Sequence, residues 1–238
     1  MLCRDDTPAI VLRMSSPTST RLGRDIRAHI PAADAVAAIV TVEPDDDAVW
    51  RAAAPHLAVR NNDSHTLYAY GLTRALLSRI PQADGAIVRP AILLHDTGWS
   101  TVPDAQILEA IAPGGGRPDL VRHHEVAGAR IARTVLMGLG RDQSVVDRVA
   151  EIIDGHDSRR EALSIEDAIV KDADKLWRVT PHGIAIVCGW FDLTPEESLR
   201  LCASRVDTSL FTDEARAMAH AFIAAASIDH VPQRATLV

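Results

Sequence analysis

Three features of this sequence predict an all-α fold. Aromatic residues make up 4% of the 238 residues, Ala and Leu are abundant, and few stretches alternate apolar and polar side chains as strands do. Apolar residues make up 47% of the chain, which is enough for a buried core. We therefore expect helices over residues 32–40, 45–54, 62–80, 84–95, 104–112, 119–138, 142–154, 163–177, 182–190, 195–205 and 212–226.

Polar capping residues and prolines mark the ends of two of these helices. Asn62 or Asp63 is expected to cap the helix that follows, and Pro81 is expected to close it. The segment PGGGRPD at 113–119 predicts a flexible loop, and its Asp119 is expected to cap the next helix.

A capping box opens the predicted helix over 195–205. Thr194 is the expected cap, Pro195 suits the first helical position, and Glu197 lies three residues after the cap. We expect this helix and the one over 212–226 to close over the core.

The chain is expected to form one domain behind a short leader. Residues 1–25 are rich in Ser, Thr, Pro and charge, which predicts a poorly ordered segment, and Met14 within it is a second candidate start. Residues 26–238 contain no internal repeat and no linker, so we expect a single helical domain there.

Charge and cysteine content limit the partners of the protein. The formal net charge of −7 and the pI near 5.8 argue against a nucleic-acid polymer or an anionic membrane surface. Cys3, Cys188 and Cys202 are few and widely spaced, which indicates reduced thiols rather than a disulfide framework. We expect a cytoplasmic protein with a small-molecule partner, and the sequence leaves the oligomeric state open, a homodimer included.

Histidines gather beside acids, beside each other or in a helix opening at His65, His95, His123, His124 and His156. Imidazole nitrogens and carboxylate oxygens are the ligands of divalent zinc, iron, manganese or cobalt, and a catalytic ion keeps a coordination position open. Intervals of about 30 residues separate successive members of this set, which is room for a helix and its return. The spacing therefore predicts one metal ligand per helix, brought together inside a bundle.

The segment AILLHDTGW leads an apolar run directly into His95 and Asp96. A buried, unpaired carboxylate is costly and needs a cation or several hydrogen bonds. We expect the run Ala91–Leu94 to be the buried part of a helix that delivers both side chains to a metal, and Gly98 to let the chain turn away.

Five motifs in order resemble the HD-domain superfamily of metal-dependent phosphohydrolases. They are His65, HD at 95–96, HHEVAGARIA at 123–132, GHD at 155–157 and KDADKL at 171–176. The resemblance covers about residues 60–178 and implies a helical HD-domain bundle with additional C-terminal helices.

The resemblance also implies a ligand set, in which His65, His95, Asp96 and Asp174 hold the first metal and Asp172 is the fallback for Asp174. In the bimetallic branches His124 and His156 bind a second ion, and Asp96 bridges the two. The expected cofactors are two divalent ions, iron or manganese, with zinc, cobalt and magnesium also open. Asp157 is expected beside these ligands or at the surface.

The implied reaction is hydrolysis of a nucleotide or another small phosphoester by a hydroxide that the metals bridge, with Asp96 holding both ions. We expect Arg60 and Lys175 to contact phosphate and His123 to protonate the leaving oxygen. Trp99 occupies the position at which some branches carry a phosphate-binding Lys, so either other residues recognise the phosphate or the substrate is different, and we expect Trp99 to contact the substrate.

Two alternative functions use the same fold. The full ligand set also resembles mixed-valence di-iron oxygenases of the superfamily, which act on a phosphonate or a polyol. A catalytically inactive helical module that binds a nucleotide or a partner is the third reading.

Overall fold

The computed structural model describes residues 27–36, 39, 41–114 and 116–230. The chain divides into two units, Met1–Ile39 and Val40–Val238. The predicted leader over 1–25 lies outside the described residues. In the first unit the structure describes two short 3₁₀ helices, η1 (Arg27–His29) and η2 (Ala33–Ala35).

The helix predicted over 32–40 is wrong in its described part, because only the three residues of η2 are helical and Val36 is extended. Residues 31 to 33, 35 and 36 are exposed, and a short helix with no buried face is marginal in water.

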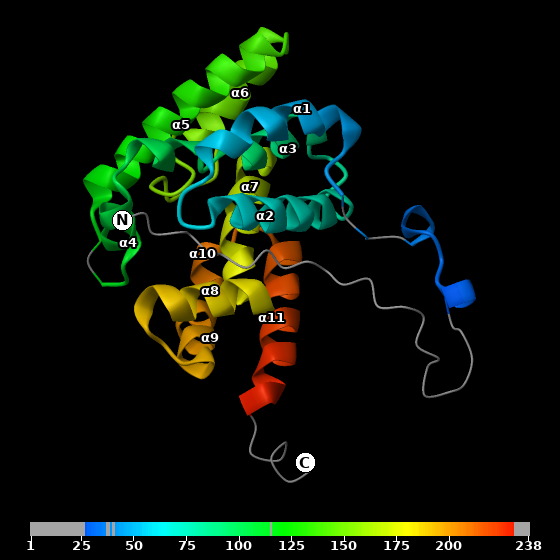
Figure 1. The fold of residues 1–238 in the computed structure, drawn as a ribbon, viewed down its shortest axis with the longest axis vertical. Coiled ribbons are helices and arrows are strands. Elements are labelled where there is room, and N and C mark those ends of the chain that lie inside the picture. Colours follow the sequence, from blue (N-terminus) through cyan, green and yellow to red (C-terminus); the bar gives the residue numbers. More distant parts are fainter. Residues whose placement is uncertain (1–26, 37–38, 40, 115, 231–238) are drawn as a thin grey trace, which may run out of the picture. The chain divides into compact units, whose positions relative to one another are not determined.

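Helices build the whole described part of the second unit, which confirms the all-α fold (Figure 1). The 3₁₀ helices in it are η3 (Ala54–His56), η4 (Thr97–Thr101), η5 (Trp177–Val179) and η6 (Ile228–His230). Its α-helices are α1 (Pro44–Ala53), α2 (Asn62–Leu77), α3 (Gly85–Leu94), α4 (Asp104–Ile111), α5 (Pro118–Gly138), α6 (Gln143–Ile153), α7 (Ile165–Leu176), α8 (Pro181–Phe191), α9 (Pro195–Ala203), α10 (Val206–Ser209) and α11 (Asp213–Ser227).

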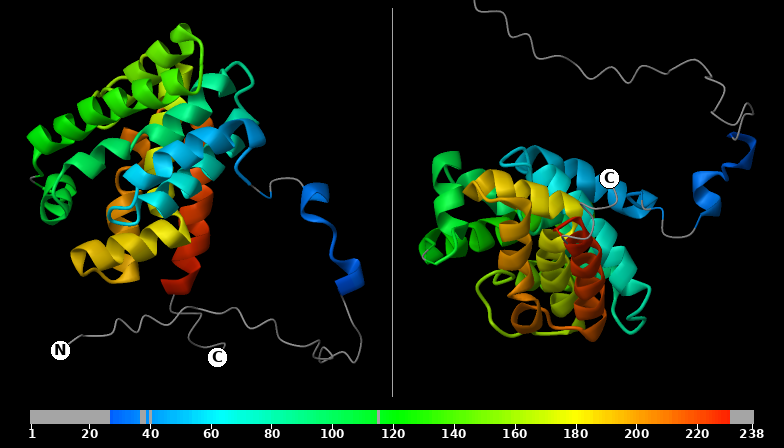
Figure 2. Two further views of the ribbon diagram at one scale, coloured as in Figure 1. Left: turned by 45° about the horizontal axis from the view of Figure 1, so that its top comes forward. Right: turned by 90° about the horizontal axis from the view of Figure 1, so that it is seen from below.

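The helix α3 lies at the centre of the core. It packs against α1, α2, α5, α6 and α7, which surround it in Figures 1 and 2. Ile92, Leu93 and Leu94 are fully buried, as a helix that is apolar all round requires. The end of α3 therefore delivers the next residues, His95 and Asp96, to the interior of the bundle.

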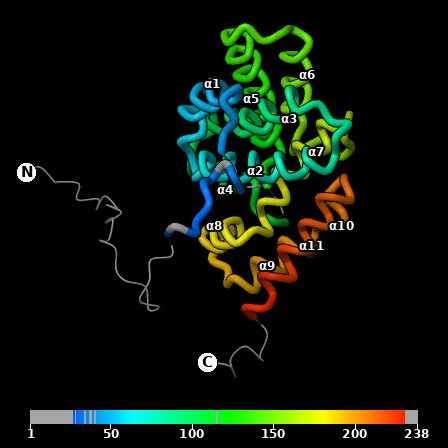
Figure 3. The backbone as a smooth tube through the Cα atoms, turned by 90° about the vertical axis from the view of Figure 1, so that its right-hand side faces the viewer, coloured from blue at the N-terminus to red at the C-terminus, as the bar shows by residue number. Residues whose placement is uncertain are grey.

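The last helices gather at one end of this unit. Figures 1 and 3 show α8, α9 and α11 on the side away from the tip of α5 and α6. Asp172 of α7 fixes the start of α11, because its carboxylate accepts hydrogen bonds from the backbone N–H of Phe211 at 2.7 Å and of Thr212 at 2.9 Å. The predicted closing helix over 212–226 thus attaches to the helix that carries Asp174.

The predicted capping box at Thr194 is confirmed. The backbone N–H of Glu197 donates to Thr194 Oγ1 at 3.3 Å, and the N–H of Thr194 donates to Glu197 Oε2 at 2.9 Å. Both bonds satisfy backbone donors that the helix itself leaves unpaired.

Two other predicted caps are wrong. Asn62 is the first residue of α2, and the cap is Asn61, which is left-handed at φ 59° and makes no side-chain capping bond. The helix α5 begins at Pro118, so that Asp119 lies in its first turn, where its carboxylate accepts a hydrogen bond from Arg117 Nε at 2.9 Å. The helix α2 thus begins at the first of its two predicted caps, Asn62 and Asp63, and α5 begins one residue before Asp119.

The end of α2 and several short elements also differ from the predictions. The helix α2 stops at Leu77, before Pro81, so that the proline does not close it. The short helices η1, η4, α10 and η6 lie outside the predicted set. Among the helices that the structure describes, none is both long and apolar enough to cross a membrane.

Candidate metal centre

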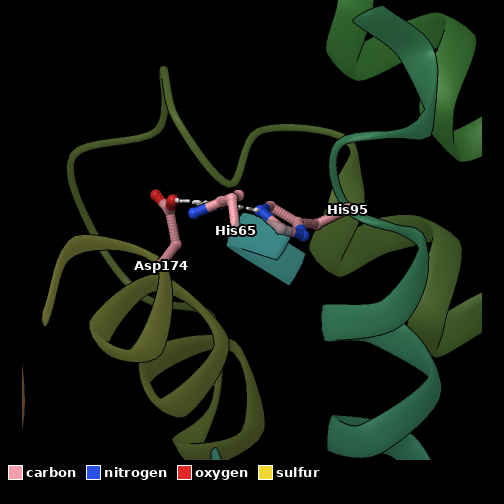
Figure 4. A group of neighbouring side chains, drawn as sticks. All are labelled: His65, His95 and Asp174. Atoms are coloured by element: carbon pink, nitrogen blue, oxygen red, sulfur yellow. Dashed lines mark hydrogen bonds and ion pairs between the residues drawn. The ribbon is translucent and has the colours of Figure 1, made fainter. Parts of the chain in front are cut away.

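Three helices bring His65, His95 and Asp174 together. His65 lies in the first turn of α2, His95 directly follows α3, and Asp174 lies near the end of α7, and their side chains converge in Figure 4. His65 Nε2 lies 3.1 Å from His95 Nε2 and 3.4 Å from Asp174 Oδ1, and His95 Nε2 lies 3.8 Å from the same oxygen. These buried atoms could hold one metal ion.

Asp96 links this group to a second one. Its Oδ2 lies 3.5 Å from His65 Nε2, whereas its Oδ1 lies 3.6 Å from His95 Nε2, 3.7 Å from His156 Nε2 and 3.9 Å from His124 Nε2. The two oxygens of Asp96 therefore face different histidines, which is the arrangement that a carboxylate shared by two ions requires. The group of His95, Asp96 and His156 could hold a metal ion as well.

Asp157 joins the second side of the cluster. Its Oδ2 lies 3.5 Å from His124 Nε2 and 3.7 Å from His156 Nε2, and these three side chains form a further group that could hold a metal. The sequence analysis placed Asp157 beside the ligands or at the surface. Its direct contact with both histidines makes it a seventh candidate ligand, and the signal for it was the adjacent His156, as in the pair His95 and Asp96.

Unpaired polar atoms test whether these residues fit a metal. His124 Nε2, His156 Nε2 and Asp174 Oδ2 are buried and have no hydrogen-bond partner among the described residues. Such atoms are costly unless something satisfies them, and a divalent cation would. The residues therefore fit the metal that the motifs imply.

Backbone carbonyls orient two of the imidazoles. His95 Nδ1 lies 2.8 Å from the carbonyl oxygen of Ile92, and His156 Nδ1 lies 2.9 Å from that of Ile153. An Nδ1–H that donates to a carbonyl leaves Nε2 as the nitrogen that can coordinate a metal once it has released its own proton. Both imidazoles thus present Nε2 to Asp96.

The site gives its two inner histidines opposite pKa shifts. Burial lowers the pKa of His124 to about 4, and the neighbouring His156 adds to this. Burial would also lower the pKa of His156, but the neighbouring carboxylates of Asp157 and Asp96 outweigh it and raise that pKa to about 10. The pKa of Asp96 is lowered, because His95 and His156 outweigh the effect of its burial.

Gly98 allows the backbones of η4 and α5 to meet. A Cβ at this position would overlap the carbonyl oxygen of His124 and approach the backbone N of Gly128 to 2.6 Å. Gly98 is not among the residues with positive φ, so its role is close approach and not the sharp turn that we expected. The contact brings His124 to Asp96.

Trp99 supports the cluster from one side. Its Nε1–H donates to Asp96 Oδ1 at 3.1 Å, and its ring stacks on that of His124 with the centroids 3.8 Å apart. The buried Trp99 also lines the cavity at the cluster. Its hydrogen bond and its ring both act on candidate ligands, which is a positioning role beyond the substrate contact that we expected.

Glu125 is a residue that the sequence analysis missed. Its buried carboxylate accepts hydrogen bonds from the backbone N–H of Asp157 at 2.9 Å and of Ser158 at 2.7 Å, and from the hydroxyl of Ser158 at 2.7 Å. These bonds hold the turn that follows His156. Its position directly after His124 in the motif was the available signal.

Arg60 lies beside the cluster, as expected of a phosphate contact. Its guanidinium lies 4.4 Å from the ring centroid of Trp190 and 5.8 Å from that of Trp99. Its Nε and Nη1 are buried without a hydrogen-bond partner in the described structure. Burial lowers the pKa of Arg60, while Asp96 opposes this.

Arg178, rather than Lys175, is the second cation at the cluster. Arg178 lines the cavity that contains His65, Asp96 and Asp174, whereas Lys175 does not, and Lys175 Nζ lies 5.4 Å from the ring centroid of Phe211. The helical repeat explains this, because a residue four positions after Asp174 shares its face and its immediate neighbour does not. Burial would lower the pKa of Arg178, but Asp174 and Asp157 raise it above the ordinary value.

Two further expected residues lie apart from the cluster. His123 is exposed, and its Nε2 lies 3.1 Å from Thr101 Oγ1, because adjacent residues of a helix point in different directions and His124 takes the inward one. The prediction of Asp172 as the fallback ligand is wrong, because its carboxylate accepts hydrogen bonds from Phe211 and Thr212.

Buried imidazoles and carboxylates that converge from several helices are what a helical metal-binding domain presents, and these groups could hold metal ions. A comparison with protein families agrees: the model of the HD domain matches residues 62–178. The chain belongs to the HD-domain superfamily, whose members are generally metal-dependent hydrolases. Comparisons with curated proteins and with solved structures found no significant match.

Proposed function

We propose that the protein is a metal-dependent phosphohydrolase that acts on a small phosphomonoester. The observation that carries the proposal is the pair of guanidiniums, Arg60 and Arg178, in the same cavity as His65, Asp96 and Asp174. Guanidinium groups pair with phosphate oxygens through parallel hydrogen bonds, and two of them beside a metal cluster suit a dianionic ester.

The cluster would hold two divalent ions. His65, His95 and Asp174 would bind the first ion, His124, His156 and Asp157 the second, and Asp96 both. Bound divalent ions supply an acidified water and neutralise negative charge on a phosphoryl group.

The residues of the chain supply binding and orientation. Stacking on Trp190 fixes the guanidinium of Arg60, and its unpaired Nε and Nη1 can donate to phosphate oxygens. Trp99 holds Asp96 Oδ1 through its indole N–H. The side chain of His123 is exposed and does not point toward the cluster, so His123 has no role in this proposal as the acid that protonates the leaving oxygen.

The proposal keeps the small-molecule partner that the net charge favours. It also keeps the cytoplasmic location that the few cysteines favour. The oxygenase alternative would use the same candidate ligands, and no feature of the described residues favours it. A polyol substrate would need several hydrogen-bonding side chains, and the cavities at the cluster offer few uncharged ones.

The test is release of inorganic phosphate by the full chain, purified without chelator and supplied with Mn²⁺. Arg178→Met should raise KM for phosphomonoesters by about two orders of magnitude, since a buried charge-assisted hydrogen bond is worth roughly 1.5–3 kcal/mol. Arg51→Met is the matched control, because Arg51 is largely exposed and pairs only with Asp47 on α1. Consumption of dioxygen without release of phosphate would reject the hydrolase proposal in favour of the oxygenase alternative. A chain that takes up no metal would favour the catalytically inactive module.

A further inference from the structure

A second cavity opens beside the metal centre. Its volume is about 320 Å³, and it shares Ile111, Asp157, Arg178 and Trp190 with the smaller cavity at the cluster. A ligand whose phosphate lies between Arg60 and Arg178 therefore has its remaining part in this space.

Helices outside the HD-domain match form most of the wall of the second cavity. The helices α8, α9 and α10 and the end of α7 contribute to it, and these helices lie together in Figure 1. The wall is mainly aliphatic, with Leu176, Val179, Val187, Leu201, Val206 and Leu210.

The second cavity offers little to a sugar or a nucleobase. Its uncharged side chains that can form hydrogen bonds are the hydroxyl of Ser209, the indole of Trp190 and the thiol of Cys202. The guanidinium of Arg60 already covers the ring of Trp190. Ribose and base groups would lose water on entry without gaining partners, which costs free energy for each group.

The charged lining residues do not change this conclusion. Arg178 and Asp157 lie where the two cavities meet, Lys175 lies over Phe211, and Arg205 is exposed. The lining of the second cavity exposes more apolar than polar surface, and apolar surface gains free energy by leaving water.

We infer that the substrate is a phosphomonoester of an apolar alcohol, with its phosphate at the metal cluster and its hydrocarbon in the second cavity. This inference rests on the proposed function and narrows it. In the reaction the bond between phosphorus and the alcohol oxygen breaks, the oxygen of water forms the new bond to phosphorus, and the alcohol oxygen receives a proton. The products are the free alcohol and inorganic phosphate.

The first experiment measures phosphate release by the metal-loaded full chain from octyl phosphate, methyl phosphate and adenosine monophosphate. We expect kcat/KM for octyl phosphate to exceed the other two values by at least about tenfold, because several methylenes leave water. Equal or faster release from adenosine monophosphate would overturn the inference and leave the proposed function standing.

The second experiment separates the two proposals if no ester is hydrolysed. Calorimetry of the metal-loaded chain should show that octylphosphonate binds at least about tenfold more tightly than methylphosphonate. Equal affinities would overturn the apolar subsite, whereas the expected ratio without any hydrolysis would reject only the proposed reaction.

A matched pair of variants locates the binding of the hydrocarbon. Leu201→Asn should weaken octylphosphonate binding by about tenfold and leave methylphosphonate binding unchanged, because Leu201 lines only the second cavity. Leu163→Asn is the control, since Leu163 is 53% exposed and lines neither cavity. Unchanged octylphosphonate affinity in Leu201→Asn would contradict the assignment.

Discussion

Asp96 organises the site at the scale of single residues. Its two oxygens face His65 on one side and His95, His156 and His124 on the other, at 3.5 to 3.9 Å. Trp99 donates to the same carboxylate and stacks on His124. A large aromatic residue at this position thus aligns ligands, which a flexible Lys could not do.

Replacement of Trp99 by Phe should weaken metal binding about tenfold. The variant keeps the ring against His124 but loses the hydrogen bond to Asp96, and loss of such a partner typically weakens metal affinity 10- to 100-fold. Titration with Mn²⁺ measures the effect. Trp50→Phe removes an indole away from the cluster and serves as the control; equal affinities in the two variants would refute the role of the hydrogen bond.

Metal affinity should rise with pH. Before a metal binds, the pKa of His156 is about 10, so this imidazole holds a proton at neutral pH and must release it to coordinate. One released proton corresponds to about a tenfold gain in affinity per pH unit below that pKa.

Asp157→Asn should lower the pKa of His156, because Asp157 is the largest contribution that raises it, and the rise of metal affinity should therefore level off at a lower pH than in the wild type. Isothermal titration between about pH 6.5 and 8.5 follows this rise. Asp207→Asn is a matched control, since Asp207 also faces a histidine, His220, at an exposed position. An unchanged pH dependence in Asp157→Asn would show that Asp157 does not control the proton on His156.

At the scale of elements, close contact between η4 and α5 sets the geometry of the cluster. Gly98 and Gly128 allow the two backbones to touch, which places His124 beside Asp96. Glu125 then holds the turn at Asp157 and Ser158. The segment of α5 from His124 to Gly128 therefore supplies a candidate ligand, an anchor and a close contact.

Gly98→Ala should destabilise the protein by about 3 kcal/mol, because its Cβ would meet backbone atoms that cannot move aside. Gly138→Ala is the control, since nothing lies within 4 Å of a Cβ there, and it should be neutral or stabilising by up to about 1 kcal/mol. Urea unfolding followed by circular dichroism compares the two. Similar stabilities would contradict the close approach.

At the scale of the whole molecule, one part of the chain carries the candidate metal ligands and another lines most of the second cavity. The HD domain over 62–178 carries the candidate ligands, and the helices that follow it form the apolar wall of the second cavity. Asp172 joins the two parts through Phe211 and Thr212. The family match thus covers all the candidate ligands, and in our proposal the residues after it select the substrate.

Much of the fold follows from local sequence signals, and the parts that differ depend on tertiary contacts. The capping box at Thr194 was predicted because it is entirely local. The motifs identified the residues of the cluster because their order along the chain is distinctive. Arg178 was not among the expected phosphate contacts, and Asp157 was expected beside the ligands or at the surface, since which neighbour on a helix or turn faces inward depends on packing. The role of Glu125 depends on a turn 32 residues away.

The most direct test of the account is the metal content of the full chain purified without chelator, measured by mass spectrometry for the wild type and for Asp96→Ala. The shared carboxylate predicts two divalent ions per wild-type chain and the loss of at least one in the variant. Full metal content in Asp96→Ala, or a wild-type chain that binds no metal, would contradict the central claim.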